Sequence, residues 1–100
     1  MLKLGNLIRE EREKRKLLLR EASALLEIDQ AILSKVERND RKATKEQVLK
    51  FSNIYKIDKE KILTIWLADR IYGLVGEEEL ALKALKVAEK EIKYQKSWGE

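Results

Sequence analysis

The sequence contains no cysteine and no histidine, and both absences narrow its chemistry. Without cysteine there can be no disulfide, no thiolate nucleophile and no thiolate metal site. Without histidine, the commonest general base and metal ligand is missing as well. An enzyme would have to rely on Asp, Glu, Lys or Tyr, and no paired-acid motif stands out from the charged surface. We therefore expect a protein that is not an enzyme and that uses no cofactor or metal.

Proline is also absent and glycine occurs only four times among 100 residues, while Leu, Lys, Glu and Ala are abundant. Such a composition favours helices, and the length is that of a single domain with little room for a second. No apolar run approaches the roughly 20 residues of a membrane helix, and the N-terminus lacks the apolar core of a signal peptide. We expect no membrane segment and a cytoplasmic location.

Charged residues make up 40% of the chain, well above the ordinary level of about 25%. The net charge is +4, and its distribution is uneven. Residues 1–60 hold 15 Lys and Arg against 11 Asp and Glu, whereas residues 61–100 hold 7 of each kind. The basic excess in the first sixty residues favours an anionic partner there. A solvated basic surface explains the charge equally well.

Apolar residues recur at helical spacing along most of the chain, which predicts an all-α fold. The pattern predicts six helices, at about residues 2–16, 18–27, 30–38, 45–55, 59–72 and 77–94. A frayed tail is expected after the sixth. The side chains expected to face inward on the middle helices are Ala22, Leu25, Leu26, Leu33, Val36, Val48, Leu49, Phe51, Ile54, Ile62, Leu63, Ile65, Trp66 and Leu67.

Capping residues mark several of these helix ends. Asp29 precedes the third helix and Asp58 the fifth, and an Asp in that place accepts backbone N–H bonds. Thr44, followed three residues later by Gln47, has the capping-box pattern at the start of the fourth helix. Asn39 stands where the third helix must stop, and Asn is the best non-glycine residue for a left-handed C-terminal position.

The second and third helices, with their short connector, form the most informative unit. Their apolar positions let one helix of about eight residues turn sharply into another and pack on it. Ser23 is small where the two helices would approach closely. These are the requirements of a helix-turn-helix, whose second helix enters a major groove roughly 12 Å wide. A plain αα-hairpin within a helical bundle satisfies the same pattern.

From Ile8 to about Leu63 the chain resembles the phage-repressor and Cro family of helix-turn-helix proteins, often called the XRE family. The segment "ILSKVERN" is similar to the end of that family's recognition helix, and "Ile8-Arg9-x-x-Arg12" is similar to its first-helix signature. The resemblance implies a compact five-helix repressor-like bundle that binds double-stranded DNA sequence-specifically as a dimer. The helix beyond it would be an addition to that fold.

The resemblance also implies roles for individual residues. The family's base-reading positions correspond to Gln30, Ala31 and Lys35, with Ile32 beside them. Gln can pair bidentately with adenine, Lys can donate to guanine, and an apolar side chain can contact the thymine methyl group. DNA-backbone contacts are expected from Ser34, Arg38, Arg41, Lys42 and Lys45.

Arg12 and Glu37 match family positions that form a partly buried ion pair between the first helix and the recognition helix. Three departures from the family pattern affect the turn and the binding surface. Leu18-Leu19 replaces a Ser-Gln pair that helps grip the DNA backbone. Glu27 replaces a turn glycine, which costs about 1–2 kcal/mol if the position keeps a positive φ. Asp29 replaces a neutral cap and brings negative charge near the DNA.

Beyond the family pattern, we expect residues 1–72 to form the DNA-binding domain and residues 73–100 a helical extension. On the sixth helix the residues Ala81, Leu85, Ala88, Ile92 and Gln95 follow the four–three spacing of a packing seam. The dimer interface is expected to include Trp66, Ile71, Tyr72, Leu85, Ala88 and Ile92. The alternative is a helix that packs back on its own domain.

These observations predict a DNA-binding transcriptional regulator. We expect a homodimeric repressor that inserts the helix at about residues 30–38 into the major groove of a palindromic operator. The alternative from another class is an antitoxin or adaptor that uses the same bundle to bind a protein partner such as a toxin. The sequence alone leaves phage repressor, restriction–modification controller and antitoxin open.

Overall fold

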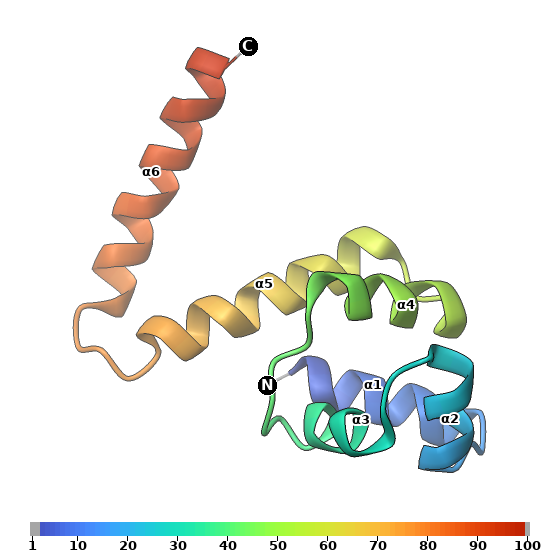
Figure 1. The fold of residues 1–100 in the computed structure, drawn as a ribbon. Coiled ribbons are helices and arrows are strands. Elements are labelled where there is room, and N and C mark those ends of the chain that lie inside the picture. The colour runs from blue at the N-terminus through green and yellow to red at the C-terminus, as the bar shows by residue number, and fades with distance from the viewer. Residues whose placement is uncertain (1–2, 100) are drawn as a thin grey trace. The chain divides into compact units, whose positions relative to one another are not determined.

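The computed structural model describes residues 3–99, and over that range its regular secondary structure is entirely helical, which confirms the predicted all-α fold. The helices are α1 (Leu4–Lys14), α2 (Leu19–Leu26), α3 (Gln30–Glu37), α4 (Lys45–Tyr55), α5 (Lys59–Val75) and α6 (Ala81–Gly99) (Figure 1). The chain divides into two compact units, the first ending at Arg70 and the second beginning at Ile71. None of the helices described here is long and apolar enough to cross a membrane.

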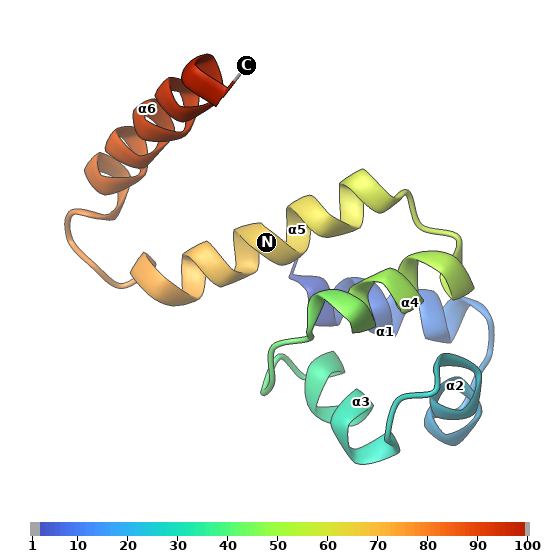
Figure 2. The same cartoon turned by 45° about the horizontal axis from the view of Figure 1, so that its top comes forward.

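The first unit is built around one apolar core to which α1 to α5 each contribute. The side chains of Ile8, Leu26, Leu33, Phe51 and Ile62, one from each helix, are at most 2% exposed. Within the bundle, α3 packs on both α1 and α2, and α4 packs on the same two helices (Figure 2). The short helices α2 and α3 thus pack on each other and on the longer helices α4 and α1, as the helix-turn-helix prediction requires.

The predicted caps are present in the structure. The Asp29 carboxylate accepts from the first free backbone N–H groups of α3, and that of Asp58 accepts from the first turn of α5. Thr44 and Gln47 form a complete capping box, in which each side chain accepts from the other residue's backbone N–H. Asn39 has φ 63°, so it occupies the left-handed position expected of it at the end of α3. These contacts satisfy backbone donors that a helix start leaves open.

The same helix-ending turn occurs twice in the first unit. The segments SALLEID (23–29) and SNIYKID (52–58) each have a left-handed fifth residue, Glu27 in the first and Lys56 in the second, both with φ 55° and ψ 44°. In each segment the leading serine hydroxyl donates to the carbonyl of the isoleucine five residues later. The position at which the family has a turn glycine therefore keeps a positive φ in this protein, although Glu27 occupies it.

Two residues predicted to face inward are exposed instead. Leu25 is 54% exposed and Leu67 is 51% exposed. Each neighbours a buried residue, Leu26 or Trp66, and adjacent residues on a helix lie about 100° apart. In each pair one residue takes the core position and its neighbour turns toward solvent. The sequence pattern missed Tyr55, which is 1% exposed at the end of α4.

The C-terminal helices differ from the predicted ranges. Helix α5 continues through Gly73 to Val75, three residues beyond its expected end. Helix α6 starts at Ala81, so Glu77–Glu79 lie in the connection that precedes it and not on its first turn. The segment expected to fray is helical up to Gly99. Helix ends without a strong cap or proline are the least constrained by local sequence.

Candidate nucleic-acid interface

Helix α3 has one buried side and one exposed side. Leu33 and Val36 face the core, at 0% and 2% exposure. Gln30, Ala31 and Lys35, which were predicted to read bases, are all exposed. The residue pattern of α3 therefore presents a mostly polar strip to solvent while its opposite side fixes the helix to the bundle.

Ile32 and Ser34 lie differently from the other predicted contact residues. The Ile32 side chain is partly buried and packs against the core, so only part of it faces outward. Ser34 is also partly buried. It lines a shallow depression between α1, α2 and α3, together with Arg9 and Arg38.

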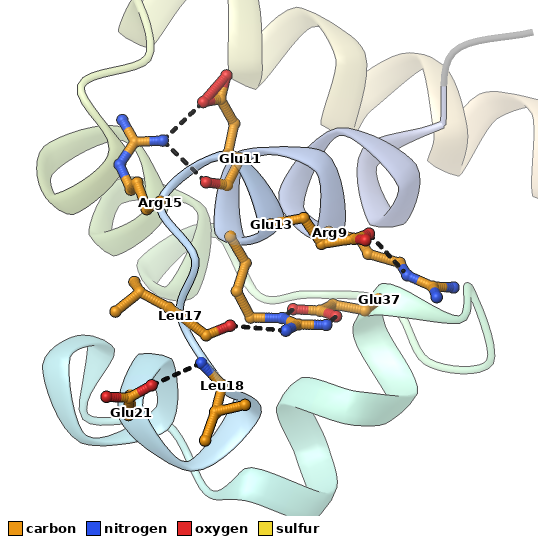
Figure 3. Close-up of polar contacts among 9 residues, drawn as sticks. Arg9, Glu11, Glu13, Arg15, Leu17, Leu18, Glu21 and Glu37 are labelled. Carbon is orange, nitrogen blue, oxygen red and sulfur yellow. Dashed lines mark hydrogen bonds and ion pairs between the residues drawn. The ribbon is translucent and has the colours of Figure 1, made fainter.

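The depression has an ion pair at its base. Arg12 Nε donates to Glu37 Oε2 at 2.8 Å, and Nη2 donates to Glu37 Oε1 at 2.9 Å. The third donor, Nη1, reaches the backbone carbonyl of Leu17 at 2.9 Å, so one guanidinium joins α1, α3 and the connection before α2 (Figure 3). The side chains are 14% and 4% exposed. The hydrogen bond to Glu37 raises the pKa of Arg12.

The start of α2 borders the same depression. The Glu21 side chain accepts from the backbone N–H of Leu18, which is half of a capping box (Figure 3). The other half is missing because a leucine side chain has no acceptor. The first-turn N–H groups of α2 therefore have no side-chain cap, and they are donors that an anion could use. Arg9, which the sequence analysis did not select as a contact residue, lies close by and pairs with Glu13 at 3.1 Å.

The loop after α3 carries exposed cations. Arg38, Arg41 and Lys42 are all exposed, and Lys45 follows on the first turn of α4. Arg38 pairs with Asp40 at 3.4 Å, an exposed contact of small energetic value. The Lys42 ammonium donates to a backbone carbonyl of α5 at 3.5 Å. Positive charge is thus gathered on the loop next to the exposed strip of α3.

The Asp29 carboxylate, which was expected to bring negative charge toward the DNA, is occupied by its capping role. Its Oδ1 accepts from Ala31 N at 2.9 Å and from Ile32 N at 3.1 Å. The partial positive charge of the helix start offsets a carboxylate in this position.

The residues expected at a dimer interface divide between the two units. Trp66 was expected both there and in the core. It belongs to the core of the first unit, 7% exposed, where its indole N–H donates to a backbone carbonyl at 2.7 Å. In the second unit, Ile71 and Tyr72 are 45% and 49% exposed on α5. On α6, Leu85 and Ile92 are 37% and 57% exposed, and Ala88 is exposed between them.

Comparison with known proteins adds to this geometry. The sequence profile of the helix-turn-helix family matches residues 8–62, more than half of the chain. No curated protein matches the sequence at a significant level. A solved structure, the crystal structure of a hypothetical protein from E. coli, is similar with a TM-score of 0.68 and 21% identity, covering 85% of this chain and 87% of that one. At this identity the likeness shows the fold alone. With its family profile and its exposed α3, the chain belongs to the XRE-type helix-turn-helix family of DNA-binding regulators.

Proposed function

We propose that this protein is a sequence-specific transcriptional regulator, a homodimeric repressor that inserts α3 into the major groove of a palindromic operator. The observation that carries the proposal is the two-sided character of α3. Leu33 and Val36 anchor it in the core, and Gln30, Ala31 and Lys35 are exposed on it. A helix held in this way presents side chains to base edges without a change in the bundle.

The exposed residues suit distinct base contacts. Gln30, in the first turn, can accept from and donate to adenine, and Lys35 can donate to guanine O6 and N7. Ala31 offers a methyl group for contact with thymine. Because Ile32 is partly committed to the core, we assign it a supporting role at the edge of the base-reading surface.

Phosphate contacts would set the register of α3 on the duplex without reading sequence. We assign these to the cations Arg38, Arg41, Lys42 and Lys45, and to Ser34 at the rim of the depression. The uncapped N–H groups of the first turn of α2 can add a contact that needs no side chain. This contact would replace in part the DNA-backbone contact of the family's Ser-Gln pair, which Leu18-Leu19 cannot make.

Dimerisation is proposed through the extension, with residues 1–72 as the DNA-binding domain and residues 73–100 as the dimerisation element. The supporting observation is that apolar side chains are exposed on both helices of this part: Ile71 and Tyr72 on α5, and Leu85, Ala88 and Ile92 on α6. Two DNA-binding domains joined in this way can occupy half-sites about one helical turn apart. Joining two weak contacts raises the affinity for a palindrome well above that of one domain.

The test is a fluorescence anisotropy titration of the full chain with its own upstream DNA and with random DNA at several salt concentrations. Lys35→Ala should weaken specific binding by about 1–3 kcal/mol per site and spare binding to random DNA. Arg41→Ala should weaken both equally and reduce the salt slope by about 1 per protomer. Lys61→Ala, which removes an exposed lysine of α5 with the same charge, is the matched control and should change neither. An equal loss for both DNAs with Lys35→Ala would exclude its base-reading role.

The second candidate is an antitoxin or adaptor that binds a protein partner such as a toxin. It is favoured by the exposed apolar side chains of α6, among which Leu82 is 76% exposed. The same titration separates the two functions. A gel-filtered protein with no salt-dependent affinity for DNA would favour the protein-binding function, because phosphate contacts always release counterions.

A further inference from the structure

The loop that carries Arg41 and Lys42, residues 38–44, is held by helices on two sides. On the α1 side, Asn39 Oδ1 accepts from the backbone N–H of Gly5 at 3.1 Å, and Asn39 Nδ2 donates to Asn6 Oδ1 at 2.8 Å. The approach is close, because a Cβ on Gly5 would lie 2.4 Å from Asn39 Oδ1. Asn39, at the beginning of the loop, is thus hydrogen-bonded directly to the start of α1.

On the other side the loop is bound to α5. The indole N–H of Trp66 donates to the backbone carbonyl of Ala43 at 2.7 Å, and both residues are buried. Lys42 Nζ donates to the Asp69 carbonyl at 3.5 Å. The Asp69 carboxylate in turn accepts from the backbone N–H of Leu4 at 2.8 Å, which ties α5 to the start of α1.

These contacts come from a part of α5 that the family profile does not include, since the match ends at residue 62. Trp66 and Asp69 lie one and two turns beyond that point. We propose that they form, with Asn39, a clasp that holds residues 38–44 in the conformation in which Arg41 and Lys42 meet DNA phosphates. The inference rests on the proposed function and deepens it. The three clasp residues are positioning residues, and the phosphate contacts are made by the loop.

The physical reason is preorganisation. A free loop must lose backbone and side-chain freedom when it docks on DNA, and that loss weakens binding. The clasp fixes the loop's two ends before DNA arrives: the left-handed Asn39, with φ 63°, at one end and the carbonyl of Ala43 at the other. Loosening either end should reduce phosphate contacts and leave the base contacts of α3 in place.

Two clasp variants of the full chain test this. Trp66→Phe keeps an aromatic ring in the core but removes the N–H donor to Ala43. Asn39→Gly keeps the positive φ at no steric cost and removes both contacts to α1. The matched control is Ile62→Val, which trims a fully buried side chain of the same helix without touching the loop. Thermal unfolding of all three variants is measured first, to check that each is folded at the assay temperature.

Each variant is titrated with operator and random DNA across salt concentrations, and backbone order parameters of residues 40–43 are measured by NMR without DNA. For both clasp variants we expect affinities for the two DNAs to fall by the same factor, of about 3–10, so that their ratio is unchanged. The salt slope should fall by about 1 to 2, and the loop order parameters should fall as well. Ile62→Val should keep the wild-type slope, affinity ratio and loop order.

Wild-type salt slope and loop order in both clasp variants would overturn the clasp and leave the proposed function standing. A loss confined to operator DNA would also overturn it, because the clasp would then act on α3. If the wild-type protein shows no salt-dependent DNA binding at all, the proposed function and the clasp both fall.

Discussion

The Arg12–Glu37 pair should respond very differently to removal of one partner and of both. The Glu37 side chain is only 4% exposed beside Arg12, and Arg12→Met removes the two hydrogen bonds that it accepts from the guanidinium. An uncompensated buried charge costs about 3–5 kcal/mol. Domains of 70 residues have roughly 4–10 kcal/mol of total stability, so this variant should be close to unfolding at 25 °C.

Removal of the acid should be milder. In Glu37→Met the guanidinium keeps its bond to the Leu17 carbonyl, and its side chain is already 14% exposed and can reach water. We expect a loss of about 1–3 kcal/mol. In the double variant no buried charge remains, and two methionines of similar length fill the space. Replacing a buried ion pair by apolar side chains is often neutral, so the double variant should be more stable than Arg12→Met.

Urea unfolding followed by circular dichroism at pH 7 and 10 °C measures the four proteins of this double-mutant cycle. The expected coupling free energy between the two positions is about 2–4 kcal/mol. A double variant whose loss equals the sum of the two single losses would refute the reasoning. It would mean that the two charges do not compensate each other, despite the two hydrogen bonds between them.

Two further predictions concern backbone strain and a buried hydroxyl. Glu27→Gly and Lys56→Gly, at identical left-handed positions, should each stabilise the fold by about 0.5–1 kcal/mol in urea unfolding, and a loss of stability in either would contradict the strain argument. Tyr55→Phe removes a buried hydroxyl with no hydrogen-bond partner among the described residues, so it should be neutral or stabilising by about 1 kcal/mol at pH 7. Burial raises the pKa of Tyr55 to about 12, above the ordinary value of 10. Between pH 10 and 12 the unfolded chain therefore ionises Tyr55 while the folded protein keeps it protonated, so the free energy of unfolding is unaffected below pH 10 and falls as the pH rises to 12. The wild type should therefore lose about 2 kcal/mol more than Tyr55→Phe over that range, and parallel pH curves would exclude this.

Local signals in the sequence were sufficient for the features that depend on few neighbouring residues. The caps at Asp29, Thr44 and Asp58 are read from one or two side chains next to a helix start, and the structure forms all three. The exposed strip of α3 follows from helical periodicity once Leu33 and Val36 are placed in the core. The Arg12–Glu37 contact needed more, because it joins residues 25 apart, and the family resemblance supplied it.

Contacts across long stretches of sequence could not be predicted in this way. Asp69 accepts from Leu4 across 65 residues, and Trp66 donates to Ala43 across 23. Neither contact has a spacing rule, and both involve residues beyond the family pattern. Trp66 was expected both to face inward and to join the dimer interface, because a large aromatic residue is common to cores and interfaces. Only the packing of α5 on the bundle distinguishes the two.

The two acidic residues of the turn between α2 and α3, Glu27 and Asp29, can be explained by comparison with the similar turn after α4. Lys56 adopts the same φ and ψ as Glu27 at a turn that has no expected DNA contact. The same serine–isoleucine hydrogen bond spans both turns, and the left-handed geometry forms in both without a glycine. By the strain argument above the substitution costs stability, and the position keeps its positive φ. What changes is charge: Glu27 is exposed, whereas Asp29 is offset by the start of α3. An exposed acid near a phosphate weakens binding to all sequences alike, so recognition by this chain should rest more heavily on the base contacts proposed for Gln30 and Lys35.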